Sequence, residues 1–159
     1  MTAGVIDPPS VRVGDRAPVF TLPDTHGTPV LSGELRGTPV VLVFVPFAFT
    51  GMCTGELREL RDHIGEFDDV GVRLLVVSCD PMSALRAWAE QESFTFDLLS
   101  DFWPHGAAAE AYGVFDAVRG RAVRGSFLID RAGVVRWTIV NPAGRARDLT
   151  GYRAALTAL

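Results

Sequence analysis

Residues 39–45, PVVLVFV, form the stretch of sequence that decides the fold. A continuous apolar run rich in β-branched residues is typical of a strand that is covered on both faces. Residues 72–79, VRLLVVSC, have the same character and stop at Asp80-Pro81. Between the two runs lies a predicted helix, residues 53–67, because its apolar residues recur at helical spacing. The sequence therefore predicts a β-α-β unit with parallel strands and a right-handed crossover.

The remaining residues predict elements on both sides of this unit. The N-terminal part carries a small β-hairpin, with strands over 18–22 and 28–31. The C-terminal part carries, in order, a helix over 81–92, an extended segment over 94–99, a short helix over 106–112, strands over 124–130 and 134–140, and a helix over 148–159. Parallel strands followed by an antiparallel pair favour a mixed central sheet flanked by helices. This is the order of an α/β protein with a thioredoxin-like fold and an N-terminal β-hairpin extension.

Composition and charge restrict the class of protein. The 159 residues are 48% apolar and 21% charged, which is ordinary for one globular domain. We expect a single domain over residues 11–159, preceded by a flexible N-terminal extension over 1–10. The net charge of −4 argues against a nucleic-acid partner, and no apolar run approaches the ~20 residues that span a membrane. The N-terminus lacks the basic and apolar regions of a secretory signal, so we expect cytoplasmic localisation.

Two cysteines, Cys53 and Cys79, are the candidates for chemistry. They are too few for a disulfide scaffold, and they do not form a Cys-x-x-Cys pair. The three histidines do not stand at metal-ligand spacing, so no metal site is expected. Each cysteine is therefore either a buried inert thiol or a redox-active one, and its surroundings must decide.

Cys53 is predicted to follow a buried strand and to begin a helix. The unpaired N–H groups and the dipole at a helix start favour an anion, and the thiolate is the reactive form of cysteine. Cys53 also lies on the apolar stripe of its helix, so its sulfur is predicted to point inward. Glu56 lies on the same flank, and a carboxylate there needs a cationic partner because an unpaired buried charge is costly.

Three more residues complete a predicted pocket. The hydroxyl of Thr50 can lie beside the sulfur, and Pro46 can cover the mouth of the pocket. Arg124 opens an apolar strand, and it can reach both Glu56 and Cys53 if that strand neighbours the one over residues 39–45. Taken alone, each of these residues fits an ordinary turn or surface role. Their combination, with the spacing Pro-x-x-x-Thr-x-x-Cys, favours a reactive site.

This spacing resembles the active-site motif of the peroxiredoxins, and Arg124 falls where that family has its catalytic arginine. Residues 14–22, GDRAPVFTL, resemble the family's N-terminal signature, although Val19 stands where an acidic residue is usual. Residues 99–106, LSDFWPHG, and 111–114, AYGV, are similar to the alkyl hydroperoxide reductase E-type subgroup, one-cysteine peroxiredoxins of actinobacteria. The resemblance covers the chain from about residue 11 to its end.

The resemblance implies a thiol-dependent peroxidase that needs no bound cofactor. Cys53 would attack a peroxide and become a sulfenic acid. Thr50 and Arg124 would hold and polarise the O–O bond, Pro46 would shield the site, and Glu56 would orient Arg124. The implied substrates are hydrogen peroxide, organic hydroperoxides and peroxynitrite. The family also suggests a homodimer or a higher homo-oligomer.

The regeneration of Cys53 leaves alternatives open. One branch of the family has a resolving cysteine five residues after the nucleophile, where this chain has Arg58, and no cysteine follows Cys79. Cys79 is either structural or the resolving residue of a two-cysteine peroxidase, which would need the two Cα atoms within ~7 Å. A structural Cys79 implies an external thiol. The resemblance suggests mycothiol with a mycoredoxin, or a thioredoxin-like protein.

Two other functions compete with the peroxidase. The missing Cys-x-x-Cys argues against a thioredoxin-like disulfide oxidoreductase. A redox sensor or holdase, in which oxidation of Cys53 changes assembly or partner binding, stays open as an added role. Outside the pocket, Trp88 and Trp137 are predicted core residues, and Arg145 and Arg147 are predicted to lie in a solvated loop.

Overall fold

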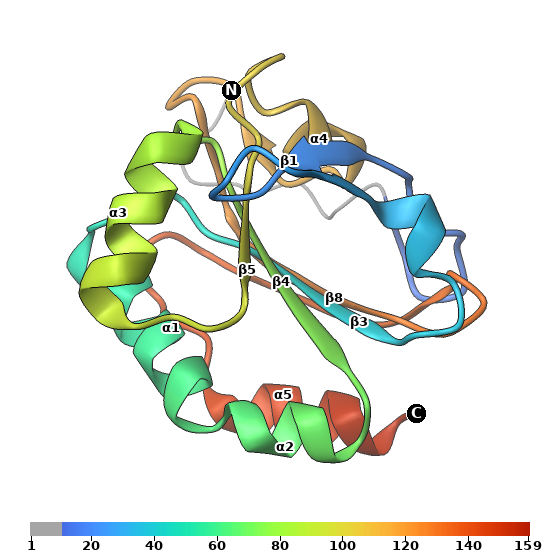
Figure 1. The fold of residues 1–159 in the computed structure, drawn as a ribbon. Coiled ribbons are helices and arrows are strands. Elements are labelled where there is room, and N and C mark those ends of the chain that lie inside the picture. Colours follow the sequence, from blue (N-terminus) through green and yellow to red (C-terminus); the bar gives the residue numbers. More distant parts are fainter. Residues whose placement is uncertain (1–10) are drawn as a thin grey trace.

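The computed structural model describes residues 11–159, and a five-stranded sheet forms its centre (Figure 1). The spatial order is β5-β4-β3-β8-β9. The strands are β3 (Val40–Phe44), β4 (Arg73–Ser78), β5 (Asp97–Ser100), β8 (Arg124–Ile129) and β9 (Val135–Asn141). β3, β4 and β5 are parallel, whereas β8 is antiparallel to β3 and β9 is antiparallel to β8. The predicted mixed sheet is confirmed, and the extension predicted over residues 1–10 lies outside the described residues.

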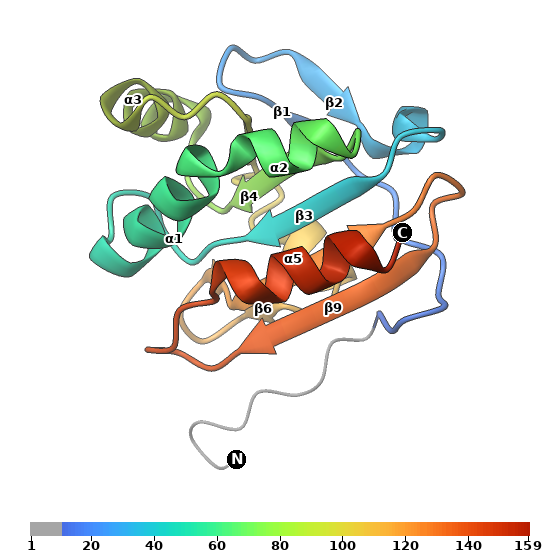
Figure 2. The ribbon, with the colours of Figure 1, turned by 90° about the horizontal axis from the view of Figure 1, so that it is seen from below.

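Helices cover both faces of the sheet, as the sequence predicts. One face carries α1 (Gly51–Asp62), α2 (Ile64–Asp69), α3 (Met82–Glu92) and α5 (Leu149–Thr157). Figure 2 looks onto this face, with α1, α2 and α5 in front of the sheet. The other face carries α4 (Ala107–Ala111), the hairpin of β1 (Thr21–Pro23) and β2 (Pro29–Leu31), and the 3-10 helix η1 (Ser32–Leu35).

The alternation of side chains along each strand divides the interior into two cores. In β3, Val41 and Val43 face α1 and α5, whereas Leu42 and Phe44 face α4. Every residue of β3 is buried, which explains why its sequence has no polar position. Burial of such a side chain contributes about 1.5–3 kcal/mol relative to exposure. Cys53 and Trp88 belong to the core under α1, and Trp137 packs against it, as predicted.

Besides shifts at the ends of several elements, the structure differs from the sequence-based expectation in two places. The helix predicted over residues 53–67 begins earlier, at Gly51, and breaks at His63 into α1 and α2. His63 has φ −121° and ψ 20°, which are not helical values, so the apolar stripe runs across two helices. The short strands β6 (Phe115–Asp116) and β7 (Arg121–Ala122) form a hairpin that the sequence did not predict, because two residues cannot reveal an alternation. Within residues 11–159, no helix has the length and apolar character needed to cross a membrane.

Candidate active site

Cys53 lies in the first turn of α1, just beyond the carboxyl end of β3. Thr50 is the N-cap residue of α1, with extended backbone angles of φ −73° and ψ 147°. The N–H of Thr54 bonds to the Thr50 carbonyl at 2.9 Å, so the N–H groups of the three preceding residues have no acceptor inside the helix. The Cys53 side chain is 0% exposed. The predicted inward orientation is confirmed, and the helix dipole favours a negative charge on the sulfur.

The loop before α1 has an unusual backbone and is held by the segment around α3. Phe49 has a φ of 66°, which bulky residues rarely adopt. The carboxylate of Asp80 accepts a hydrogen bond from the Ala48 N–H at 2.8 Å. Trp88 Nε1 donates to the Thr54 hydroxyl at 3.2 Å. These contacts fix the start of α1, and the sequence does not reveal them because each joins residues more than 30 positions apart.

Arg124 supplies a positive charge beside the sulfur. Arg124 begins β8, which pairs directly with β3. Its contact with Cys53 required these two strands to be neighbours, and they are. Its Nη1 lies 3.4 Å from Cys53 Sγ and also donates to Glu56 Oε1. The Arg124 side chain is 8% exposed, and its Nε is buried without a partner among the described residues. A buried guanidinium N–H is therefore available for another acceptor.

Glu56 also binds a second arginine, Arg147, and here the sequence-based expectation is wrong. Arg145 is exposed as predicted, but the Arg147 side chain is 1% exposed. Nε and Nη2 of Arg147 donate to the two carboxylate oxygens of Glu56 at 2.9 and 3.1 Å. Its Nη1 donates to the Phe44 carbonyl, the Gly125 carbonyl and the Ser126 hydroxyl. Arg147 thus joins α1 to β3 and β8.

The two arginines determine the charge of Glu56. Burial alone would raise the pKa of this carboxyl, but the hydrogen bonds and charge of Arg147, with the charge of Arg124, outweigh burial. The pKa of Glu56 therefore lies below its usual value. A buried carboxylate at Glu56 indicates a cationic partner, and the sequence already offered Arg124 for that role. Nothing in the segment around Arg147 marks that residue as the second.

Thr50 and Pro46 lie on the loop between β3 and Cys53, but they differ in exposure. Pro46 is buried, whereas Thr50 is exposed. The Thr50 hydroxyl donates to the Phe47 carbonyl at 3.0 Å, and it makes no capping bond to α1. Within residues 11–159 this hydroxyl makes no hydrogen bond to the sulfur. Its lone pairs remain able to accept.

Cys79 is also buried, at 2% exposed. Its side chain, however, points to the opposite face of the sheet. It comes directly after the end of β4, in which Leu75 and Val77 face the core beneath α4. Cys79 continues this alternation. Its thiol also contacts the backbone of Ala122, a residue of that same core. The thiol of Cys79 is therefore directed toward the side of the sheet that carries α4, whereas Cys53 belongs to the core beneath α1.

The surroundings of Cys79 disfavour its thiolate. Burial, and then the negative charges of Asp101 and Asp80, raise the pKa of the Cys79 thiol to about 12, although the Ala122 backbone partly offsets them. At neutral pH a thiol with so high a pKa is almost entirely protonated. Cys79 is therefore a poor nucleophile in this fold.

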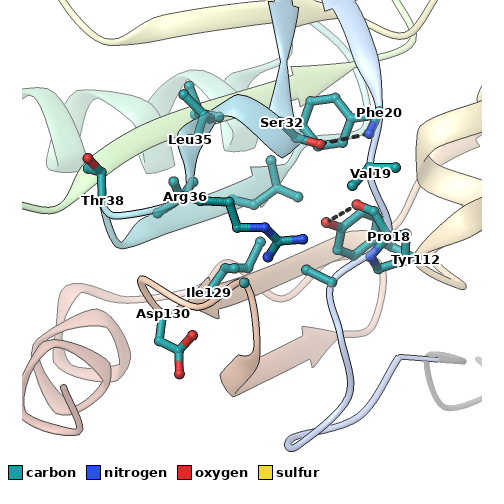
Figure 3. Close-up of a pocket in the computed structure, with 15 residues that line it drawn as sticks. Pro18, Val19, Phe20, Ser32, Leu35, Arg36, Thr38, Tyr112, Ile129 and Asp130 are labelled. Carbon is teal, nitrogen blue, oxygen red and sulfur yellow. Dashed lines mark hydrogen bonds between the residues drawn. The ribbon is translucent and has the colours of Figure 1, made fainter.

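A small pocket lies away from both cysteines, between the N-terminal segment, η1 and the sheet (Figure 3). Figure 3 shows the Arg36 side chain extending over it and the Tyr112 hydroxyl bonded to the Pro18 carbonyl. Its free space is about 30 Å³, which is enough for a water molecule but not for an organic ligand. None of the residues in the Cys53 site lines this pocket.

Sequence comparison places the chain in a known family. Residues 13–138 match the AhpC/TSA family. The alkyl hydroperoxide reductase E of Mycobacterium tuberculosis is 47% identical over 150 residues, covering 94% of this chain and 98% of that protein. The putative peroxiredoxin bcp of Coxiella burnetii is 34% identical over 150 residues, covering 89% of this chain and 98% of that protein.

Solved structures have the same fold. Peroxidoxin BcpB from Mycobacterium tuberculosis superposes with a TM-score of 0.82 at 33% identity, covering 93% of this chain and 96% of that one. AhpC from Enterococcus faecalis gives a TM-score of 0.84 at 25% identity, covering 92% and 90%. The predicted thioredoxin-like α/β fold is confirmed. The chain belongs to the AhpC/TSA family and is a peroxiredoxin of the alkyl hydroperoxide reductase E type, an enzyme that reduces peroxides.

Proposed function

We propose that Cys53 is the nucleophile that reduces hydrogen peroxide, organic hydroperoxides and peroxynitrite. One observation carries this proposal. Arg124 places Nη1 3.4 Å from the sulfur and keeps a second buried N–H, on Nε, without a partner among residues 11–159. A buried donor beside a nucleophile suits an oxygen atom that gains negative charge during the reaction.

The reaction then follows from these groups. The Cys53 thiolate attacks one peroxide oxygen, so an S–O bond forms while the O–O bond breaks. From hydrogen peroxide or an organic hydroperoxide the leaving oxygen takes a proton and departs as water or an alcohol, and from peroxynitrite it departs as nitrite. Cys53 becomes a sulfenic acid in each case. Arg124 stabilises the charge on the leaving oxygen, and the Thr50 hydroxyl helps to hold the peroxide. Pro46 keeps water from the sulfur.

Two residues act through Arg124 rather than on the peroxide. Glu56 fixes the guanidinium of Arg124, and Arg147 fixes Glu56 by bonding both of its carboxylate oxygens. Both are positioning residues. A guanidinium that is held in place before the reaction stabilises charge without reorganising.

We propose that an external thiol recycles Cys53, by a mycothiol and mycoredoxin type of reaction. Two features of Cys79 support this proposal over an internal disulfide. Its thiol points to the other face of the sheet, and the pKa of that thiol is raised to about 12. Metal and bound cofactor have no part in this cycle.

The experiment is mass spectrometry combined with stopped-flow peroxide consumption. After one equivalent of peroxide, we expect a sulfenic acid on Cys53, and then a mixed disulfide once a thiol is added. Cys53→Ser should consume no peroxide, whereas Cys79→Ser should react as the wild type does. An internal Cys53–Cys79 disulfide would identify a two-cysteine peroxidase instead. A peroxide reaction that persists in Cys53→Ser would disprove the nucleophile.

The assembly and location of the enzyme are part of the same proposal. The structural relatives are peroxiredoxins, and the family resemblance implies a homodimer or a higher homo-oligomer. We place this enzyme in the cytoplasm as part of the proposal. Sedimentation velocity at micromolar concentration tests the assembly, and a single species of monomer mass would disprove it.

A further inference from the structure

The recycling step that we propose brings a second anion to the site. The thiolate form of the external thiol attacks the sulfur of the Cys53 sulfenic acid. Arg124 is poorly placed to guide that anion in from solvent, because its Nη1 already binds Cys53 and Glu56 and its free Nε is buried. A second positive charge at the edge of the site would therefore matter for this half of the cycle.

Arg121 provides such a charge. It lies in β7, three residues before Arg124, and its guanidinium carbon stands 5.8 Å from the centre of the Phe47 ring. Among residues 11–159, its side chain has neither a carboxylate within ion-pair distance nor a hydrogen bond. Asp116, which is opposite Arg121 in the hairpin, is bound by Arg119 instead. The positive charge of Arg121 is thus not neutralised locally.

Phe47 connects Arg121 to the Cys53 site. It follows Pro46 directly in the chain, and its carbonyl accepts the hydrogen bond of the Thr50 hydroxyl. Phe47 and Arg121 are both half-buried, so each has a surface that solvent reaches. Contact with an aromatic face also limits the freedom of a guanidinium. Arg121 is therefore a fixed, accessible cation beside the loop that presents Cys53.

We propose that Arg121 is a specificity-determining residue that attracts the thiolate, and further negative charge, of the external thiol. This inference rests on the proposed recycling by an external thiol. The thiolate sulfur forms an S–S bond with the Cys53 sulfur while the S–O bond of the sulfenic acid breaks. The hydroxide that leaves takes a proton and becomes water, so the products are a mixed disulfide and water.

The test measures the reduction of preformed Cys53 sulfenic acid by small thiols of different charge. The probes are 3-mercaptopropionate, 2-mercaptoethanol and cysteamine, whose thiolate forms carry net charges of about −2, −1 and 0. With rates corrected for thiolate fraction, we expect the wild type to favour each more negative thiol by about threefold. This order should weaken as salt is raised, because salt screens exposed charges.

Variants separate Arg121 from general surface charge. Arg121→Gln should remove most of the charge preference, and Arg121→Lys should restore it. Arg131→Gln is the control, since it removes one exposed positive charge beyond the far end of β8 and should retain the preference. A full wild-type preference in Arg121→Gln would overturn the inference.

The failure of the proposed function gives a different signal. If Cys79 resolved the sulfenic acid, its decay would not depend on the thiol concentration, and mass spectrometry would find an internal disulfide. That result would overturn both proposals. A thiol-dependent decay with unchanged charge preference in Arg121→Gln would overturn the role of Arg121 alone.

Discussion

Cys53 and Cys79 are alike in burial and place but unlike in their electrostatic surroundings. Each lies just beyond the carboxyl end of one of two neighbouring parallel strands, and each is almost fully buried. Cys53 lies in the first turn of α1, and Nη1 of Arg124 lies 3.4 Å from its Sγ. Cys79 instead has Asp101 and Asp80 near its thiol.

The two thiols differ in the charged groups around them, since a cation lies beside Cys53 and two carboxylates lie near Cys79. Burial disfavours the thiolate of Cys79, and two nearby carboxylates oppose it further. At Cys53 the start of a helix and the guanidinium of Arg124 lie beside the sulfur instead.

The largest expected effect concerns the reactivity of Cys79 itself. Iodoacetamide reacts with thiolates, so in the folded protein Cys79 should be alkylated about 10³-fold more slowly than an ordinary exposed cysteine. Peptide mapping after timed alkylation measures this rate. Denatured protein is the control, in which both cysteines should react alike. Fast labelling of Cys79 in the folded state would contradict the comparison.

Removing the cation from the Cys53 side should make that site resemble the Cys79 site. We expect Arg124→Gln to slow the oxidation of Cys53 by about 10²–10³-fold, because a preorganised donor to the developing charge is lost. Stopped-flow mixing with hydrogen peroxide measures the rate. Arg136→Gln removes an exposed arginine paired with Asp130 and should react within about twofold of the wild type.

The second arginine should affect stability more than chemistry. Arg147→Met leaves Glu56 with one cation and three strand-end acceptors without their donor, so unfolding should become easier by about 3–5 kcal/mol. Urea denaturation measures this change. Arg145→Met, two residues earlier and exposed, is the control and should change stability by less than about 0.5 kcal/mol. Equal stability of the two variants would contradict the assigned network.

The smallest expected effect is the contribution of Glu56 ionisation to stability at low pH. The pKa of Glu56 is lowered in the folded protein, so the unfolded chain binds its proton more readily. Its stabilising contribution is complete above the ordinary glutamate pKa of about 4.3 and is lost as pH falls through the lowered pKa. Urea denaturation between pH 6 and pH 3 should show a steeper loss in the wild type than in Glu56→Gln. Equal slopes would show that Glu56 is not held ionised.

The sequence predicts the strands and helices well where the local pattern is long. The run over residues 39–45 and the periodic residues after Cys53 led to β3 and α1, and both were found. The break at His63 and the hairpin of β6 and β7 escaped prediction because each involves too few residues for a periodic signal. The loop that carries Phe49 escaped for another reason, since its support comes from Asp80, 32 residues from Ala48.

The residues of the candidate site also divide into those that the sequence reveals and those that it does not. Cys53, Thr50 and Pro46 lie within eight residues of one another, so their spacing could be recognised directly. Arg124 could be proposed only on the condition that its strand lay beside β3, and the sheet order meets that condition. Arg147 was assigned to solvent, because no local feature distinguishes it from the exposed Arg145.

The sequence by itself determined the α/β fold, the presence of a helix that has Cys53 near its start and the inward direction of the sulfur, because these depend on short-range periodicity and spacing. Only the tertiary structure decided which arginines reach Glu56 and which face of the sheet holds Cys79. Those outcomes depend on strand order and on contacts between distant segments. Electrostatic energy depends on distance in space, which adjacency in the chain does not fix.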